Sequence, residues 1–278
     1  MTGRVRAVAC DLDGTLLRSD LSISPRTRAA LAAVEERGIL LVFVTGRPPR
    51  WIWPVAAQVD HRGLVICANG ALLYDLHTEQ VVGGDLISPE VLAATVDRLR
   101  AADPGLAFAI EYGAQFAHEA AYPVAVEHRR ADVRTVSPSE LVEHAAAKLL
   151  VRHPVRASAD LLVQVAELVG DLVEVTHSTP IGPGLLEVSA AGVSKASALA
   201  RLCAEHGIAA ADVVAFGDMP NDLPMLAWAG RPYAMANAHP DVLARISGRA
   251  PSNDADGVAT VLEELLAVHA EPDPLPGR

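Results

Sequence analysis

Short apolar runs, each followed by a polar or glycine-rich cluster, recur along the sequence. Four of these runs lie at residues 5–10, 40–44, 64–68 and 213–216, and the clusters DLDG, TGR, NG and GDMPND follow them in that order. Unbroken apolar runs without alternation are typical of strands that are buried on both faces of a parallel sheet. The pattern therefore predicts four strands of such a sheet, each ending at a polar cluster.

Helical patterns lie between these runs. Ser24 and Pro25 open the segment RTRAALAAVEER and Gly38 closes it, while Ser194 precedes KASALARLCAEH, which Gly207 ends. A serine N-cap, a proline in the first turn and a glycine stop are typical helix boundaries. The alternation of strands and helices predicts a doubly wound, mostly parallel α/β domain, whose ligands bind beyond the carboxyl ends of the strands.

The middle of the chain mixes helices with strands in hairpin-like order. We expect one helix from Ser88 to about residue 101, a short helix in SPSE and a third helix that Ser158 opens. The expected strands are LAFAIEY, AQFAHEA, AAKLLVRH, LVEVTHS and LLEVS. This pattern predicts an α+β insert of roughly 100 residues, the size of a small domain. We place the edges of this insert near Gly83 and Leu186, so that 84–186 is a second domain and 1–83 and 187–278 form the doubly wound core.

Composition and charge narrow the class of ligand. The 278 residues carry a formal net charge of −11 without any block of lysine and arginine, and only 4% are aromatic. Nucleic acids and anionic membranes are bound by basic surfaces, so we expect neither as a partner. No apolar run approaches the ~20 residues of a membrane span, and the first residues lack a signal-peptide pattern. We expect a cytoplasmic protein whose three cysteines are reduced core residues.

Two carboxylates, Asp11 and Asp13, stand one residue apart directly after the first apolar run. A buried carboxylate without a partner is costly, so these acids either cap a loop or hold a cation and do chemistry. Taken alone, such a pair fits a polar loop. The context DLDGT favours chemistry more strongly, because Gly14 permits a tight turn and Thr15 can cap the segment after it.

Polar residues at the other strand ends favour the same interpretation. Lys195 lies in the first turn of a predicted helix, where its charge opposes the helix dipole but strengthens a phosphate site. Each cluster alone also fits an ordinary turn or a surface lysine. Together they meet at one sheet edge, because the carboxyl ends of parallel strands share that edge. Besides Asp11 and Asp13, the candidates are Thr45, Gly46, Arg47, Lys195, Asp218, Asn221 and Asp222.

Several carboxylates at one edge cannot all ionise side by side without a cation. Mg²⁺ suits them because it takes oxygen ligands and keeps waters and substrate phosphate in its octahedron. An aspartate beside Mg²⁺ can attack phosphorus once the metal and Lys195 offset the charge of the substrate. A second acid two residues along a strand points the same way, so it can protonate the leaving oxygen and then activate water.

The motifs resemble, in order and spacing, those of a known superfamily. DLDGTL, TGR, the lysine of GVSKASAL and GDMPNDLPML resemble the four motifs of the haloacid dehalogenase (HAD) superfamily. The resemblance is closest to the Cof-like phosphatases, which also carry an NGA after the third strand, here at 69–71. Their closing motif looks like SNDADGVATVLEEL at 252–265. The resemblance covers the core on both sides of the insert and implies a Rossmann-like core.

This resemblance implies a role for each matching residue. Asp11 looks like the nucleophile that becomes an aspartyl-phosphate, and Asp13 looks like the general acid and base. Thr45 and Lys195 look like the pair that holds the phosphate. The implied metal ligands are Asp11, the backbone carbonyl of Asp13, and Asp218. Further substrate contacts are expected from Gly46, Arg47 and Asn221, with Asp222 in a supporting position.

The position of the insert sharpens the resemblance. The stretch between Asp13 and Thr45 is too short for a domain, whereas the stretch between Gly70 and Lys195 can hold one. That order resembles the type-two cap of sugar-phosphate and coenzyme phosphatases, which would close over the site and contact the rest of the substrate. The candidates for cap contacts are Glu111, His118, His177 and Thr179. For Trp51 and Trp53, packing beneath the cap is favoured over lining the cleft.

These observations predict a Mg²⁺-dependent phosphatase that hydrolyses small phosphomonoesters. Sugar phosphates, pyridoxal phosphate and flavin mononucleotide all fit this class of cap, so the partner is a small phosphorylated metabolite of open identity. Three alternatives remain: a phosphomutase of the same superfamily, a phospho-receiver module, and a regulatory protein that binds a sugar phosphate. The sequence does not predict an oligomeric state.

Overall fold

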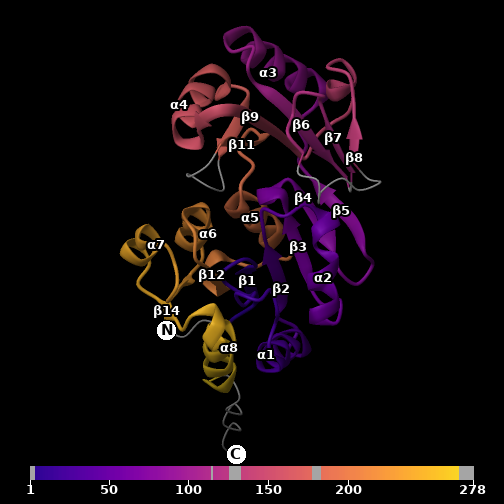
Figure 1. The fold of residues 1–278 in the computed structure, drawn as a ribbon. Helices are drawn as coiled ribbons and strands as arrows, with labels where there is room; N and C mark the ends of the chain where they lie inside the picture. Colours follow the sequence, from indigo (N-terminus) through magenta and orange to yellow (C-terminus); the bar gives the residue numbers. More distant parts are fainter. Residues whose placement is uncertain (1–3, 114, 125–132, 177–182, 269–278) are drawn as a thin grey trace, which may run out of the picture.

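The structure, a computed structural model, describes residues 4–113, 115–124, 133–176 and 183–268. Within these residues the strands form two sheets, one of eight strands and one of six, and helices pack on both (Figure 1). The smaller sheet, drawn above the larger one in Figure 1, lies beyond the end of the larger sheet at which the polar clusters are found.

The larger sheet is mostly parallel. Its strands are β1 (Ala7–Asp11), β2 (Leu40–Val44), β3 (Leu64–Cys67), β4 (Leu72–Asp75), β5 (Gln80–Gly84), β12 (Val213–Gly217), β13 (Arg231–Met235) and β14 (Arg249–Ala250). Their order is β14-β13-β12-β1-β2-β3-β4-β5. Neighbours are parallel from β14 to β3, and the pairs β3–β4 and β4–β5 are antiparallel. This arrangement confirms the expected doubly wound α/β core.

The central strands are buried on both faces, as the unbroken apolar runs predict. Every residue of β1 is buried, and large side chains of its neighbours, such as Phe43 and Phe216, have no accessible surface. The edge strand β5 differs, because its sequence QVVGG is exposed along its whole length. Since β5 faces solvent, no apolar pattern marks it in the sequence.

Helices cover both faces of the larger sheet. They are α1 (Pro25–Glu36), α2 (Trp53–Ala56), α5 (Lys195–Glu205), α6 (Leu223–Trp228), α7 (Pro240–Arg245) and α8 (Gly257–Val268). The chain steps along the sheet in opposite directions after α1 and after α5, so right-handed crossovers place these helices on opposite faces. α1 packs against α8, and α5 packs against α6.

Serine residues begin two of these helices, as the sequence predicts. The Oγ of Ser24 accepts a hydrogen bond from the N–H of Thr27 at 3.0 Å, and Pro25 occupies the first turn of α1. Ser194 and Ser197 form a reciprocal capping box at the start of α5. The second cap fixes where α5 begins, and therefore where Lys195 lies.

The smaller sheet is mostly antiparallel. Its strands are β6 (Ala107–Tyr112), β7 (Gln115–His118), β8 (Val133–Thr135), β9 (Lys148–Ala157), β10 (Val173–Thr176) and β11 (Pro183–Ala190), in the order β10-β11-β9-β6-β7-β8. Two helices, α3 (Pro89–Ala102) and α4 (Ser158–Val169), pack on it through Leu92, Leu161 and Val165. In Figure 1 both helices lie on the side of this sheet that faces away from the larger sheet.

This second sheet confirms the expected α+β insert and refines its details. The short helix expected in SPSE is a three-residue 3-10 helix, Glu140–Val142. β11 continues through residue 187, so Glu187 pairs within the smaller sheet although the expected core resumes there. The division of the chain at residues 83 and 187 stays a prediction.

The three cysteines, Cys10, Cys67 and Cys203, are buried free thiols. Burial raises the pKa of all three, which keeps them in the unreactive thiol form. Among the described helices, none is both long enough and apolar enough to cross a bilayer.

Candidate active site

The carboxyl ends of three parallel strands bring the expected residues to one place. Asp11 is the last residue of β1, Thr45 follows β2 directly, and Asp218 follows β12. Lys195 is the first residue of α5, and its Nζ lies 2.6 Å from Asp11 Oδ1 and 2.7 Å from Asp222 Oδ1. Groups 184 positions apart in the chain are therefore in direct contact.

The turn after β1 requires a glycine. Gly14 has a φ of +78°, and a Cβ at this position would lie 2.4 Å from Asp218 Oδ2. The neighbouring Thr15 donates its hydroxyl to the other carboxylate oxygen of Asp218, at 3.0 Å. The DLDGT turn therefore sets the position of an acid that lies more than 200 residues later in the chain.

Burial and charge shift the pKa values of this cluster in different directions. Burial raises the pKa of Asp11 well above its ordinary value, against the opposing effect of Lys195. Burial, with the charge of Asp222 adding to it, raises the pKa of Asp218 to about 6. Burial alone would lower the pKa of Lys195, but the carboxylates of Asp11 and Asp222 outweigh it and raise that pKa. One ammonium thus faces three acids, and a further cation would balance the remaining charge.

The acid cluster fits a hard cation. Oxygens of Asp11, Asp218 and Asp222 lie within 4.8 Å of one another. A buried, oxygen-only donor set of this kind suits Mg²⁺. Asp222 already uses both oxygens, because Oδ1 accepts from Lys195 and Oδ2 accepts the backbone N–H groups of Asp218 and Met219 at 3.0 Å each. Asp11 and Asp218 are therefore the side chains best placed to bind a cation, and Asp222 orients Lys195.

Asp13 forms an ion pair with Arg47. Nε of Arg47 donates to Asp13 Oδ2 at 2.8 Å, and Nη2 of Arg47 donates to Asp13 Oδ1. Arg47, which is expected to contact the substrate, is thus held by Asp13, which is expected to act as the general acid and base. A bound phosphate dianion would compete for the same guanidinium, since arginine binds carboxylate and phosphate with similar geometry.

A cavity of about 450 Å³ opens beside these groups. It is lined by Asp11, Asp13, Thr45, Gly46, Arg47, Trp51, Asn69, Glu187, Lys195, Met219, Pro220, Asn221 and His239. Asp218 and Asp222 are not in its wall and contact Thr15 and Lys195 instead. Trp51 lines this cavity, so the expectation that it only packs beneath the cap is wrong. Trp53 is exposed and is not part of the wall.

The sequence contains two lysines, and both are buried beside this cavity. Besides Lys195 there is Lys148 of β9, whose Nζ donates to Glu187 Oε2 and to the backbone carbonyl of Gly46, at 3.0 Å each. Nδ2 of Asn69 donates to the same Glu187 oxygen at 2.8 Å. Two strands of the smaller sheet, β9 and β11, therefore hold the loop that carries Thr45 and the turn that carries Asn69.

The turn after β3, which carries Asn69, also contacts the segments of both phosphate-binding candidates, Thr45 and Lys195. Ala68 and Asn69 have left-handed φ values of +52° and +57°, and Gly70 follows at +117°. The N–H of Asn69 donates to the carbonyl of Thr45 at 3.0 Å, and a Cβ at Gly70 would lie 2.4 Å from the carbonyl oxygen of Ser194. Backbone strain in two successive non-glycine residues is typical of functional sites.

Two of the cap candidates, Glu111 and His118, do not line this cavity. Glu111 is buried and binds Arg50, with 2.9 Å between its Oε1 and Nη2 of the arginine. His118 bonds to a neighbouring backbone carbonyl at 2.8 Å through Nδ1. Neither residue is part of the cavity wall. His177 and Thr179 lie outside the described residues.

Sequence reasoning missed three residues of this region: Lys148, Glu187 and His239. It also gave Asn69 no role beyond its motif. A signal was available for Lys148, because a lysine in the apolar run AAKLLVRH needs a buried partner. Its partner Glu187 is 39 residues away, and no local pattern connects the two.

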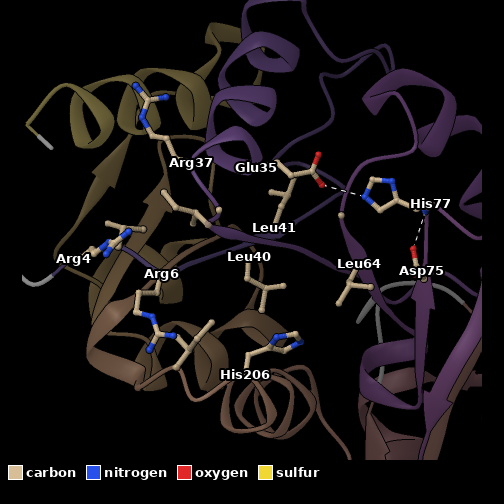
Figure 2. A pocket seen from close by; sticks show the side chains of 15 residues that line it. Arg4, Arg6, Glu35, Arg37, Leu40, Leu41, Leu64, Asp75, His77 and His206 are labelled. Carbon is tan, nitrogen blue, oxygen red and sulfur yellow. Dashed lines mark hydrogen bonds and ion pairs between the residues drawn. The ribbon is translucent and has the colours of Figure 1, made fainter. Parts of the chain in front are cut away.

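A second cavity, of about 560 Å³, lies at the opposite edge of the larger sheet (Figure 2). Two of its basic side chains, Arg6 and Arg37, bind backbone carbonyls at the ends of helices. Nη1 of Arg6 donates to the carbonyl of Gly207 at 2.6 Å, just beyond α5, and Nη1 of Arg37 donates to the carbonyl of Ala33 at 3.1 Å, in the last turn of α1. Basic groups are favourable at the carbonyl end of a helix. The edge with the acid cluster is therefore the candidate active site.

Comparison with known proteins agrees with this geometry. The profile of the haloacid dehalogenase-like hydrolases matches residues 8–262. The HMP-PP phosphatase of Serratia proteamaculans is 30% identical, over 85% of this chain and 86% of the relative. The 5-amino-6-(5-phospho-D-ribitylamino)uracil phosphatase YwtE of Bacillus subtilis is 26% identical, over 95% of this chain and 99% of the relative.

Solved structures share the fold. The crystal structure of TM0651 from Thermotoga maritima superposes with a TM-score of 0.77 at 28% identity, and covers 98% of this chain and 100% of that chain. The profile match over most of the chain and the relatives of similar length show that the chain belongs to the haloacid dehalogenase-like hydrolases and is an enzyme of the phosphatase type.

Proposed function

We propose that the chain is a Mg²⁺-dependent phosphatase that hydrolyses small phosphomonoesters through a phosphorylated Asp11. One observation carries the proposal: Asp11, Lys195 and Asp218 converge from separate segments beside a cavity of about 450 Å³. The contact between Lys195 Nζ and Asp11 Oδ1 supports the proposal, because it brings a cation to the carboxylate that is proposed to attack phosphorus.

The chemistry needs two proton transfers, and Asp13 is the group to perform them. An oxygen of Asp11 attacks phosphorus, the bond from phosphorus to the ester oxygen breaks, and the leaving oxygen takes a proton from Asp13. Water then attacks the aspartyl-phosphate and gives a proton to Asp13, and the bond between phosphorus and Asp11 breaks. The products are an alcohol and orthophosphate, and both aspartates return to their starting state.

The remaining residues hold the phosphate. Lys195 offsets its charge, and Thr45 offers a hydroxyl from the loop after β2. Arg47 is positioned to exchange its contact with Asp13 for a phosphate oxygen, which would free Asp13 for proton transfer. Gly46 and Asn221 line the same cavity and complete the proposed substrate site.

Mg²⁺ would be held by the side chains of Asp11 and Asp218 and by the backbone carbonyl of Asp13. When bound, it would neutralise charge on the phosphoryl oxygens and on the attacking carboxylate. The buried, oxygen-only donor set of this chain supports that assignment.

Protons and Mg²⁺ should compete for the acid cluster. The pKa of Asp218 is raised to about 6, so between its ordinary value and about 6 the folded protein binds the proton more tightly than the unfolded chain. The free energy of unfolding therefore falls as pH rises through that range and Asp218 ionises. A cation that binds the ionised carboxylate offsets this loss of stability. Saturating Mg²⁺ should raise the melting temperature by about 5 °C or more near pH 7.5.

The corresponding shift near pH 5 should be clearly smaller. Differential scanning fluorimetry with MgCl₂, against NaCl of equal ionic strength, measures both shifts. Asp218→Asn should remove most of the Mg²⁺ effect at the higher pH. Equal shifts at the two pH values would contradict binding of Mg²⁺ to this cluster.

The names of the relatives support a small metabolite as substrate. The Serratia proteamaculans relative is named an HMP-PP phosphatase, and the Bacillus subtilis relative is named for a phosphorylated ribitylaminouracil. We extend only the class to this chain: a phosphorylated coenzyme, coenzyme precursor or sugar, hydrolysed without a macromolecular partner.

Continuous release of orthophosphate tests the proposal. With Mg²⁺, the protein should release phosphate from p-nitrophenyl phosphate over many turnovers, and excess EDTA should stop the release until Mg²⁺ is restored. A phospho-receiver would stop after about one turnover, and a phosphomutase would convert a sugar phosphate to an isomer without free phosphate. Either result would contradict the proposed function.

A further inference from the structure

The wall of the candidate cavity combines buried polar groups with two large exposed apolar side chains, and Asp13, Asn221 and His239 are its exposed polar residues. Asp11, Thr45 and Lys195 are buried in its wall, whereas Trp51 and Met219, which line the same cavity, are 42% and 37% exposed. Single exposed apolar side chains need no explanation on a protein surface. Two large exposed apolar side chains at the same cavity do need an explanation, because both would lose contact with water when a substrate fills the cavity.

Trp51 is supported from beneath. The guanidinium carbon of Arg50 lies 5.1 Å from the centre of the indole ring and 5.3 Å from the ring of Phe116. Arg50 is itself held by Glu111 at 2.9 Å, and both side chains are nearly buried. The indole therefore rests on a guanidinium that is fixed between the two sheets. Because the indole is already held in place, ligand binding costs little side-chain entropy.

A fixed and partly exposed indole beside a phosphate site would contact the leaving group of a bound phosphomonoester. Resting on the proposed phosphatase function, we infer that Trp51 stacks on the substrate, and that the substrate is a phosphomonoester of a flat heteroaromatic ring. The phosphate lies beside Asp11, Thr45 and Lys195, and the ring lies against Trp51. Stacking of a ring on an aromatic side chain is worth a factor of about 10 to 100 in affinity.

The face formed by Trp51 and Met219 is less suited to a sugar. A pyranose can also lie against an indole, but its hydroxyls then need hydrogen-bond partners on the other sides. Met219 offers none, and Glu187 Oε2 already accepts from both Lys148 and Asn69. Apart from the catalytic groups, the partners left in the described wall are Asn69 Oδ1, Asn221 and His239, fewer than a pyranose needs on all its sides. A hydroxyl buried without a partner loses binding energy. A ring whose polar atoms lie only at its edge avoids this loss.

Steady-state kinetics on three substrates tests this inference. The probes are pyridoxine 5′-phosphate, which has a ring but no aldehyde to react with lysine, glucose 6-phosphate and glycerol 1-phosphate. The wild type should have its lowest KM for pyridoxine 5′-phosphate. Trp51→Leu should raise that KM by about 10- to 100-fold and change the KM for glycerol 1-phosphate by less than about threefold.

Two further variants complete the experiment. Trp51→Phe keeps an aromatic face and should recover most of the affinity for pyridoxine 5′-phosphate. Trp53→Leu is the matched control, because Trp53 is 63% exposed and lies outside the cavity wall, and it should change neither KM. Circular dichroism establishes that each variant is folded.

Several results would overturn the inference. Equal losses of kcat on all three substrates after Trp51→Leu would mean that the indole only supports the fold of the site. An unchanged KM for pyridoxine 5′-phosphate, or a lowest KM for glucose 6-phosphate, would contradict stacking with a flat ring. A different result would contradict the proposed phosphatase function, namely that the wild type releases no phosphate from any ester.

Discussion

Asp11→Asn should abolish phosphate release, with a loss on the order of 10⁴-fold or more in kcat. An amide oxygen cannot form the acyl-phosphate, so the first step loses its nucleophile rather than a supporting contact. The fold should survive, because asparagine has the same shape and its carbonyl can still accept from Lys195, whose second partner, Asp222, is untouched. Orthophosphate release and thermal denaturation, measured on the same samples, check both statements.

Covalent trapping gives an independent readout for Asp11. Acid quench of the wild type during turnover of a ³²P-labelled ester should leave label on the protein that hydroxylamine releases, as expected for an acyl-phosphate. Asp11→Asn should retain no such label. Asp60→Asn is the matched control, because Asp60 is exposed and has a φ of +53°, which asparagine also tolerates. Normal turnover in Asp11→Asn would show that another group is the nucleophile.

Lys195→Met should lose on the order of 10³-fold in kcat and also destabilise the protein. The variant leaves Asp11 and Asp222 buried without their cation, which costs about 3–5 kcal/mol near neutral pH. Asp11 can escape this cost by binding a proton, because its pKa is already raised by burial and loses the opposing effect of Lys195 in the variant. The loss of melting temperature relative to the wild type should therefore be smaller near pH 5 than near pH 7.5.

The other lysine provides a matched comparison for this prediction. Lys148 is as buried as Lys195, at 3% against 4% exposed, but it contacts Glu187 and Gly46 instead of Asp11. The kcat of Lys148→Met should therefore be at least about tenfold higher than the kcat of Lys195→Met. Equal losses would mean that a buried cation matters in general, and that contact with Asp11 does not.

The sequence was most informative where residues lie at strand ends. Asp11, Thr45 and Asp218 follow buried strands of one parallel sheet, so the topology alone places them at one edge. Lys195 followed from a capped helix, since Ser194 fixes where α5 starts. These elements obey local rules, and those rules also predicted the α+β insert between the two halves of the core.

Pairings between side chains of separate segments could not be predicted in this way. Arg47 was expected on the substrate and is instead paired with Asp13, because an arginine beside an open carboxylate binds it when no phosphate competes. The contact of Lys148 with Gly46 joins residues 102 positions apart in different sheets. Periodicity identifies which face of a strand is buried, but it does not identify which residue of another sheet lies opposite.

The placement of both lysines beside the catalytic cavity has a practical consequence. Amine-directed acylating reagents meet no lysine on the surface of this enzyme, because the only two ammonium groups on side chains are enclosed between its sheets. Acylation of Lys148, read by mass spectrometry, would therefore report any opening of the structure that exposes this side chain to solvent.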